Sequence, residues 1–454
     1  MKIFFKRTYD ARFFLASLLV LTSVILLTSP GAEAMPSFSR QTGQNCNVCH
    51  TQSFGPNLTP FGRDFKLGGY TMGGGSGTAA KLPPISAMIT GSFTNTQRDQ
   101  PDGTLRSGYN KNNNFTFDEA ALFYAGRIYG NVGAMTEVKY DGYDDKLVMG
   151  GTDIRFADQL DLFDTPITYG ISLNNNPTVQ DLWNTTKWGF PYTGSAVQPE
   201  VGDSSLIDGG LKRQVGGATA YTMINNLLYL EAGAYGSFSS TSQRAFGIAG
   251  PKRVSLDGPA PYWRVALQHD WQGHYFSLGH YGMSADVSLP GRDMSYGSDH
   301  YTDVAVDATY QYMANPKHIF EAKTTYIYED QKLSASRQAA TPPDPSTGRT
   351  YLNTYKLNLA YTFDQTYGIT FGYNNISGSR GPIIDPTDPG AATRPNSHFY
   401  TAELVYVPFG KSNAYSYLMN LRTSLQYIGY SQANGTSTDA QFNNTFMVNG
   451  WLAF

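Results

Sequence analysis

The sequence contains little cysteine, little charge and no long apolar stretch beyond its first 34 residues. It has two cysteines among 454 residues, and charged residues make up only 15% of it. No run of ~18 or more apolar residues follows residue 34, which excludes a bundle of membrane-spanning helices. No long basic run is present and the formal net charge is −3, so we expect no nucleic-acid partner. Aromatic residues and glycine are abundant instead, with 32 Tyr, 26 Phe and 47 Gly.

Both cysteines lie in one short motif, Cys46-Asn47-Val48-Cys49-His50. Two thiols at this spacing can each add to one vinyl group of a haem, and the adjacent histidine can then bind the iron as proximal ligand. The motif predicts one covalently bound c-type haem, held by Cys46, Cys49 and His50. A redox disulfide would give His50 no role and would need a βαβ setting that the sequence lacks. A structural zinc site would need about four ligands, and only His50 lies nearby.

The N-terminus has the features of an export signal over residues 1–34. Basic residues come first, an apolar run of about fifteen residues follows from Phe13 to Leu27, and Ala32-Glu33-Ala34 offers a small-residue cleavage site. The apolar run is shorter than the ~20 residues of a spanning helix, so an uncleaved anchor is the weaker alternative. We expect the mature chain to begin at Met35, in an oxidising compartment outside the inner membrane.

Alternating apolar and polar residues recur from Ile85 to the C-terminus. They predict an antiparallel barrel of about sixteen strands, in which one face of each strand meets lipid and the other a wet lumen. The expected strands are residues 85–97, 115–129, 131–143, 152–161, 165–175, 211–223, 227–238, 261–271, 273–284, 300–313, 317–329, 350–363, 366–377, 397–408, 415–430 and 441–454. The terminal Phe454 ends an alternating strand, which resembles the assembly signal of bacterial outer-membrane proteins.

The connections between these strands alternate in length. Those after the even-numbered strands are tight and carry turn residues, as in Asn225-Asn226, Gln272-Gly273 and Asp364-Gln365. Those after the odd-numbered strands are mostly long and rich in Gly, Pro, Asn, Asp and Ser, and residues 174–210 form the longest. This alternation favours an all-β outer-membrane barrel over a soluble sandwich. It also predicts that the tight turns and both termini lie on the periplasmic side.

Residues 35–84 remain as a short segment ahead of the barrel, which we expect to cover residues 85–454. A segment of about fifty residues struggles to bury a large cofactor alone, because so much of its surface stays exposed. A sixteen-strand lumen is wide enough to hold a plug. The sequence therefore predicts a short N-terminal plug that carries the haem inside the barrel.

Several groups could occupy the distal position of the haem iron. Met72 is favoured, because it precedes Gly73-Gly74-Gly75, a run that could let it fold back toward His50. Packing of Met72 against the barrel wall is the alternative. Met88, the new amino terminus, a lumen-facing side chain or water are the other candidates. Ligation by methionine would raise the potential relative to two histidines.

Two further pairs of residues each have two interpretations. Arg63 and Lys66 could pair with the haem propionates, or they could belong to an ordinary solvated turn or short helix. Trp183 and Trp188 lie in the longest loop, where they could line an inward-folded constriction or sit at a membrane interface.

Taken together, the signal, the single CxxCH and the barrel resemble the fused monohaem cytochrome c–porin family of the bacterial outer membrane. The specific part of the resemblance covers about residues 36–72. It consists of Cys46, Cys49 and His50, with Phe38-Ser39-Arg40-Gln41-Thr42-Gly43 before them and Pro60-Phe61-Gly62-Arg63-Asp64-Phe65-Lys66-Leu67-Gly68-Gly69-Tyr70 after them.

This resemblance implies a ferrous-iron oxidase that moves electrons across the outer membrane. Fe(II) would be the extracellular donor, and a periplasmic cytochrome or copper protein would be the acceptor. Because ferric iron is insoluble near neutral pH, only the electron should cross. Asp141, Asp144 and Asp145 in one predicted outer loop are candidates for iron access, or simply a solvated loop. A haem-plugged porin for small solutes and a haem oxidoreductase acting on a small molecule are the alternative functions.

Overall fold

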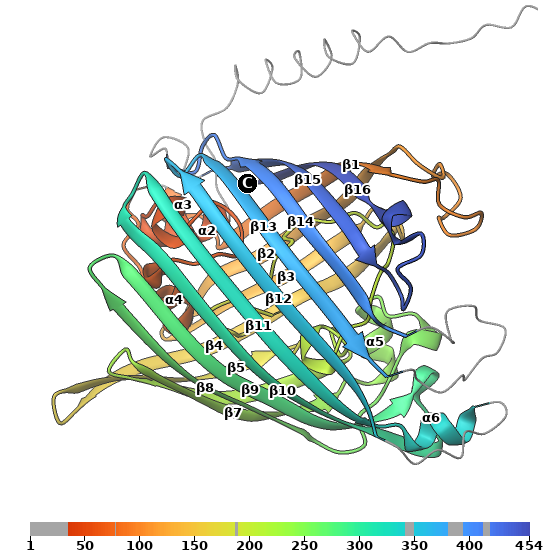
Figure 1. Cartoon of the computed structure of the whole chain (residues 1–454). Coiled ribbons are helices and arrows are strands. Elements are labelled where there is room, and N and C mark those ends of the chain that lie inside the picture. Colours follow the sequence, from red (N-terminus) through yellow and green to blue (C-terminus); the bar gives the residue numbers. More distant parts are fainter. Residues whose placement is uncertain (1–34, 78, 187–188, 341–348, 380–393, 412–417) are drawn as a thin grey trace, which may run out of the picture.

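A closed antiparallel barrel of sixteen strands forms the body of the protein (Figure 1). The computed structural model describes residues 35–77, 79–186, 189–340, 349–379, 394–411 and 418–454. The predicted signal peptide, residues 1–34, and Trp188 lie outside these residues. Each strand pairs with its neighbours in sequence, and β16 closes the barrel by pairing with β1. The predicted all-β barrel of about sixteen antiparallel strands is confirmed.

The elements have the following bounds. The strands are β1 Ile85–Thr96, β2 Asn114–Tyr129, β3 Val132–Asp141, β4 Lys146–Leu162, β5 Thr165–Asn174, β6 Val215–Ile224, β7 Leu228–Ser237, β8 Ala260–Trp271, β9 His274–Leu289, β10 Asp293–Asn315, β11 His318–Lys332, β12 Thr350–Phe363, β13 Tyr367–Gly378, β14 Ser397–Tyr406, β15 Asn420–Gln432 and β16 Thr445–Ala453. The helices are α2 Pro36–Thr42, α3 Cys46–Cys49, α4 Pro60–Leu67, α5 Ser240–Ala245 and α6 Ser334–Ala339, with short 3-10 helices η1 Ala79–Lys81, η2 Leu206–Asp208, η3 Gly250–Lys252, η4 Pro290–Arg292 and η5 Ala440–Asn443.

The strands alternate between an apolar outer face and a polar inner face. On β5, Tyr169, Ile171 and Leu173 are 37%, 48% and 50% exposed. Ser172 and Asn174, which alternate with them along the strand, are buried. Successive side chains of a strand point to opposite sides, so this pattern gives the barrel an apolar belt and a polar interior. No helix in the described ranges is long and apolar enough to cross a membrane.

Tight turns gather at one end of the barrel, which we call the turn end. At Asn225-Asn226, Gln272-Gly273 and Asp364-Gln365 both central residues have positive φ, as the favoured two-residue hairpin turns require. These three turns are confirmed. The start of β1 and the C-terminus lie side by side at this end, because Ala87 and Phe454 exchange backbone hydrogen bonds. The opposite end, called the loop end, carries the longer connections, including α5 and α6 (Figure 1).

Each predicted strand overlaps an observed one, but several boundaries differ. The β9–β10 hairpin is the largest correction, because β10 begins at Asp293 rather than near residue 300. Residues rich in Gly, Ser and Asp indicated a loop there. They form a hairpin extension instead, in which Ser288 pairs with Ser298 and Asp286 with His300. At the C-terminus, η5 delays the start of β16 to Thr445.

Candidate functional site

The CxxCH motif forms one short helical turn that packs against α4. α3 spans Cys46–Cys49, and the His50 backbone N–H closes it on the Cys46 carbonyl at 2.8 Å. The Thr59 N–H donates to the Cys49 carbonyl at 2.9 Å, and the Thr59 hydroxyl caps α4 by accepting from the Gly62 N–H at 3.2 Å. A Cβ at Gly62 would lie 2.3 Å from the Cys49 carbonyl oxygen, so this close approach requires glycine.

Residues 35–84, called the N-terminal segment, are bonded to inward-facing side chains from widely separated strands. Gln52 donates to Thr370 of β13 at 3.1 Å, and Arg63 donates to Gln311 of β10 at 3.0 Å. On the other side of the barrel, the Tyr70 hydroxyl donates to Asp153 of β4 at 2.6 Å. Because these strands lie far apart around the barrel, the contacts place the segment in the lumen, enclosed by the barrel wall. Figure 1 shows α2, α3 and α4 there.

The connection between β5 and β6 also folds into the lumen. Trp183 is 2% exposed, its Nε1 donates to the Tyr275 hydroxyl at 2.6 Å, and its ring lies edge-on to Tyr229. The prediction of an inward-folded loop at Trp183 is therefore confirmed, and an interfacial position for Trp183 is excluded. Residues 175–186, which we call the inward loop, contact both the N-terminal segment and the barrel wall.

Buried charges hold the inward loop in place. Arg264 of β8 lies between two carboxylates, with Nη2 at 3.4 Å from Asp181 in the loop and 2.6 Å from Asp307 of β10. Lys323 of β11 donates to the Trp183 carbonyl at 3.0 Å and to Asn57 of the N-terminal segment at 2.9 Å. The charges are almost completely buried, so they are stable only while paired.

Lys66 joins the inward loop to α4. Its ammonium donates to the carbonyl oxygens of Val179 and Asp181 at 3.0 and 2.6 Å and to Asn184 Oδ1 at 3.0 Å. Arg63 donates to the Leu58 carbonyl at 2.7 Å and lies over the Tyr275 ring. Both cations thus have protein partners, and neither belongs to a solvated turn.

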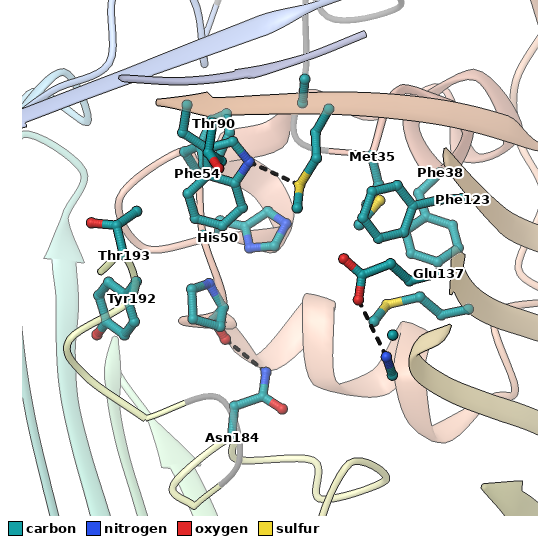
Figure 2. A pocket seen from close by; sticks show the side chains of 18 of the residues that line it. Met35, Phe38, His50, Phe54, Thr90, Phe123, Glu137, Asn184, Tyr192 and Thr193 are labelled. Carbon is teal, nitrogen blue, oxygen red and sulfur yellow. Dashed lines mark hydrogen bonds between the residues drawn. The ribbon is translucent and has the colours of Figure 1, made fainter. Parts of the chain in front are cut away.

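A cavity of about 650 Å³ adjoins the CxxCH motif. It lies on the side of the lumen that β1, β2 and β16 form. Cys46, Cys49 and His50 line it, together with apolar side chains that include Phe38, Phe54, Phe65, Phe123 and Leu58. Figure 2 shows His50, Phe54, Met35 and Phe123 around this space. From the motif the cavity reaches Asp118, Asp141 and Met149, near the loop-end termini of β2, β3 and β4. It therefore extends lengthwise through the lumen.

The residues around the motif fit a c-type haem. The cavity volume lies within the ~300–1,000 Å³ typical of ligand and cofactor pockets. Within the described chain the two thiols are not joined in a disulfide, and Cys46 Sγ accepts from Asn420 Nδ2 at 3.3 Å. Burial lowers the pKa of His50 to about 4, so its imidazole is neutral at pH 7 and can bind a metal. Two thiols and a neutral imidazole are the groups that a thioether-linked, histidine-ligated haem requires.

The structure does not bring Met72 to this cavity. Met72 is 37% exposed and is not among the lining residues, although it is the methionine that sequence proximity favours. Four other methionines line the cavity instead: Met35, Met88, Met135 and Met149. Arg63 does not line the cavity either, whereas Lys66 does.

Trp451 is a lining residue that the sequence reasoning missed. Its ring packs edge-on against Phe54 at 4.7 Å, and its Nε1 donates to the Met88 sulfur at 3.1 Å. The signal was present in the alternation of the last strand. Phe446 and Val448 point outward, so Trp451 falls on the inner face.

Acidic side chains line the loop-end part of the cavity, but only one of the three predicted aspartates is among them. Asp141 lines it with Asp118, Glu119 and Glu137, and Lys139 is paired with Glu119. Asp144 pairs with Lys146 at 2.5 Å, and Asp145 accepts from the Tyr140 hydroxyl at 2.5 Å. No group of three or more His, Cys, Asp or Glu side chains in the described ranges is arranged to hold a metal ion.

No protein-family model and no curated protein matches this chain. Solved outer-membrane barrels are similar to it at low identity. An anion-selective porin from Comamonas acidovorans has a TM-score of 0.43 and 12% identity over 81% of this chain and 98% of the porin. Pseudomonas putida OprB has a TM-score of 0.45 and 14% identity, covering 82% and 94% of the two chains.

The outer membrane channel DcaP of Acinetobacter baumannii has a TM-score of 0.45 and 11% identity over 82% of this chain and 96% of the channel. With TM-scores below 0.5, these likenesses add nothing to the barrel that the strand pairing defines. They also say nothing about a ligand.

Proposed function

We propose that this protein is an outer-membrane c-type cytochrome–porin fusion that carries electrons inward across the outer membrane. Its extracellular donor would be Fe(II), and its acceptor a periplasmic cytochrome or copper protein. In this proposal the tight turns and both termini face the periplasm, and the loop end faces outward. An apolar belt around a closed barrel supports the membrane location, because closure leaves no unpaired strand edge in lipid.

The observation that carries the proposal is the single cavity that adjoins the CxxCH motif and runs toward the loop end. Its lining includes Cys46 and His50 near the turn end and Asp118 and Asp141 near the other. A small donor could thus approach the motif from outside without crossing the barrel wall. Four carboxylates, Asp118, Glu119, Glu137 and Asp141, line that part beside three basic side chains, and this small excess of negative charge would favour a cation over an anion.

In this electron transfer, each group of residues would have a separate role. Cys46 and Cys49 would anchor the haem covalently, and the neutral His50 would bind its iron. When bound, the haem supplies one-electron redox chemistry. Phe38, Phe54 and neighbouring apolar side chains exclude water from that end of the cavity. The barrel insulates the redox centre from lipid.

The motif also lies close to the turn end, where an acceptor could approach. The Asn47 N–H donates to the Gly410 carbonyl at 3.2 Å, and Asn47 Nδ2 donates to Gln365 Oε1 at 2.6 Å. Gln365 belongs to the tight turn between β12 and β13, and Gly410 belongs to the connection between β14 and β15 at the same end, where the predicted periplasmic face lies. Proximity to the acceptor at one end and an access path at the other are what an electron conduit needs.

A haem-plugged porin for small solutes is the second candidate. The same elongated cavity favours it, because its loop-end part is lined by mixed charges, Lys139, Lys212 and Arg213 among them. Charged side chains of both signs are compatible with passage of small polar solutes. The two functions differ in what crosses the barrel, an electron or a solute.

Two measurements on the purified, haem-loaded chain separate these candidates. As a conduit, it should show dithionite-reducible c-type bands, be reduced by Fe(II), and give little conductance in a planar bilayer. Large open-channel currents would favour the porin, and failure of Fe(II) to reduce the protein across pH 4–7 would remove the iron donor. Rapid binding of cyanide with turnover of a small substrate would favour a haem oxidoreductase. The Cys46→Ser/Cys49→Ser protein, which carries no attachment thiols, is the matched control.

A further inference from the structure

The cavity contains a methionine whose sulfur is already oriented by a hydrogen bond. Met88 of β1 is 8% exposed, lines the cavity with His50, and accepts a hydrogen bond at its sulfur from Trp451 Nε1 at 3.1 Å. Of the four methionines that line the cavity, Met88 is the one whose sulfur receives a hydrogen bond within the described ranges.

Trp451 is itself fixed by the N-terminal segment. Its ring packs edge-on against Phe54, four positions after His50, with ring centres 4.7 Å apart and an angle of 73°. Thioether sulfur is a weak acceptor, so packing rather than the strength of the bond holds the partly buried indole N–H against it. Such outer partners orient the side chains that bind metals. The sulfur keeps a second lone pair for another partner.

The wall around Met88 is made of small residues. In the strand register Met88 lies opposite Ala121 of β2 and Ala453 of β16, and both alanines are buried. Two alanines flanking a methionine leave room for a broad, flat group to approach the sulfur. Trp451 and Phe54 line the same space.

We propose that Met88 is the distal ligand of the haem iron and that Trp451 is its positioning residue. This inference rests on covalent haem attachment, as proposed above, but it does not depend on the electron donor. The two axial ligands would then come from different parts of the fold, His50 from the N-terminal segment and Met88 from the barrel wall. The barrel would complete the cytochrome, and the bond to sulfur would fasten the segment in the lumen.

The test is spectroscopic and uses the full haem-loaded chain. The ferric protein should show the long-wavelength charge-transfer band of a sulfur–iron bond, and Met88→Leu should abolish it completely. Leucine has a similar volume, so the barrel should assemble. Met88→His should restore a six-coordinate low-spin haem without that band and with a lower potential. Met72→Leu and Met149→Leu are matched controls that should keep the band.

Trp451→Phe tests the positioning role separately. The band should remain, but the potential should fall, because loss of the N–H leaves more electron density on the sulfur. An unchanged potential would overturn the role of Trp451. Persistence of the band in Met88→Leu, or its loss in Met72→Leu, would overturn the role of Met88. Absence of covalent haem from the wild-type chain on a denaturing gel would instead overturn the proposed function on which both roles rest.

Discussion

The two sides of the lumen differ in what their strands present to the interior. Around β8, β10 and β11 the inner face carries long charged side chains, among them Arg264, Asp307 and Lys323, and these bind the inward loop. Around β1, β2 and β16 the inner face carries Ala121, Ala453 and the sulfur of Met88, and there the cavity remains.

The difference shows how a wide barrel can be closed and kept hollow at once. Long side chains reach into the lumen, pair with one another and bind the inward loop, because buried charges must be paired. Small side chains stop at the wall and leave space, which aromatic side chains such as Phe54 and Phe123 line. We expect the packed side to determine whether solutes pass, and the hollow side to determine whether a cofactor binds.

The largest effect is expected on the hollow side, from Cys46→Ala together with Cys49→Ala. This double variant should lose covalent haem completely, because no other thiol exists in the chain. Haem staining on a denaturing gel measures the loss. The barrel should still assemble, since the charge network of the packed side does not involve the thiols. Full haem staining in this variant would contradict the attachment site.

Next in size is Arg264→Met on the packed side. It leaves Asp181 and Asp307 buried without their cation, so barrel stability should fall by about 3–5 kcal/mol. Bilayer conductance should rise, because the inward loop loses its anchor. Urea unfolding and single-channel recording check the two effects. Adding Asp307→Asn should recover part of the stability, and unchanged conductance would show that the loop is held by other contacts.

A smaller effect is expected from Gly62→Ala, which tests how the hollow side is shaped. The new Cβ would meet the Cys49 carbonyl oxygen at 2.3 Å, and relieving this overlap should cost about 1–3 kcal/mol. The yield of haem per barrel should fall, because α3 is pushed from its position beside α4. Gly236→Ala is the control, since no atom lies within 4 Å of its Cβ position. Equal haem yields in the two variants would contradict the packing argument.

The smallest effect is expected from Lys411→Ala at the turn end. Lys411 pairs with Asp364, but their side chains are 40% and 42% exposed, so water screens the pair. Neither unfolding by urea nor conductance should change measurably. A loss as large as that of Arg264→Met would show that burial does not separate the two classes of ion pair.

Local pattern was sufficient to predict most of the barrel. The strands follow from a two-residue alternation, and turns such as Asn225-Asn226 follow from residues that accept positive φ. The β9–β10 extension was missed because Gly, Ser and Asp usually end strands, whereas here cross-strand pairing overrides their preference. Trp183 left two interpretations open, since a tryptophan suits both a lumen and a membrane interface.

The candidate site could likewise be predicted from the sequence only in part. Cys46, Cys49 and His50 are neighbours in sequence, so their chemistry could be predicted from spacing alone. Met72 was favoured for its closeness along the chain, yet the folded segment leaves it outside the cavity. Met88 and Trp451 come from the first and last strands, which meet only when the barrel closes.

The sequence by itself determined the strands, the tight turns and the CxxCH motif, because each depends on residues close together in the chain. Only the tertiary structure decided which side of the lumen is filled and which methionines line the cavity with His50. Those outcomes depend on strand register, barrel closure and the pairing of buried charges, which bring together residues hundreds of positions apart.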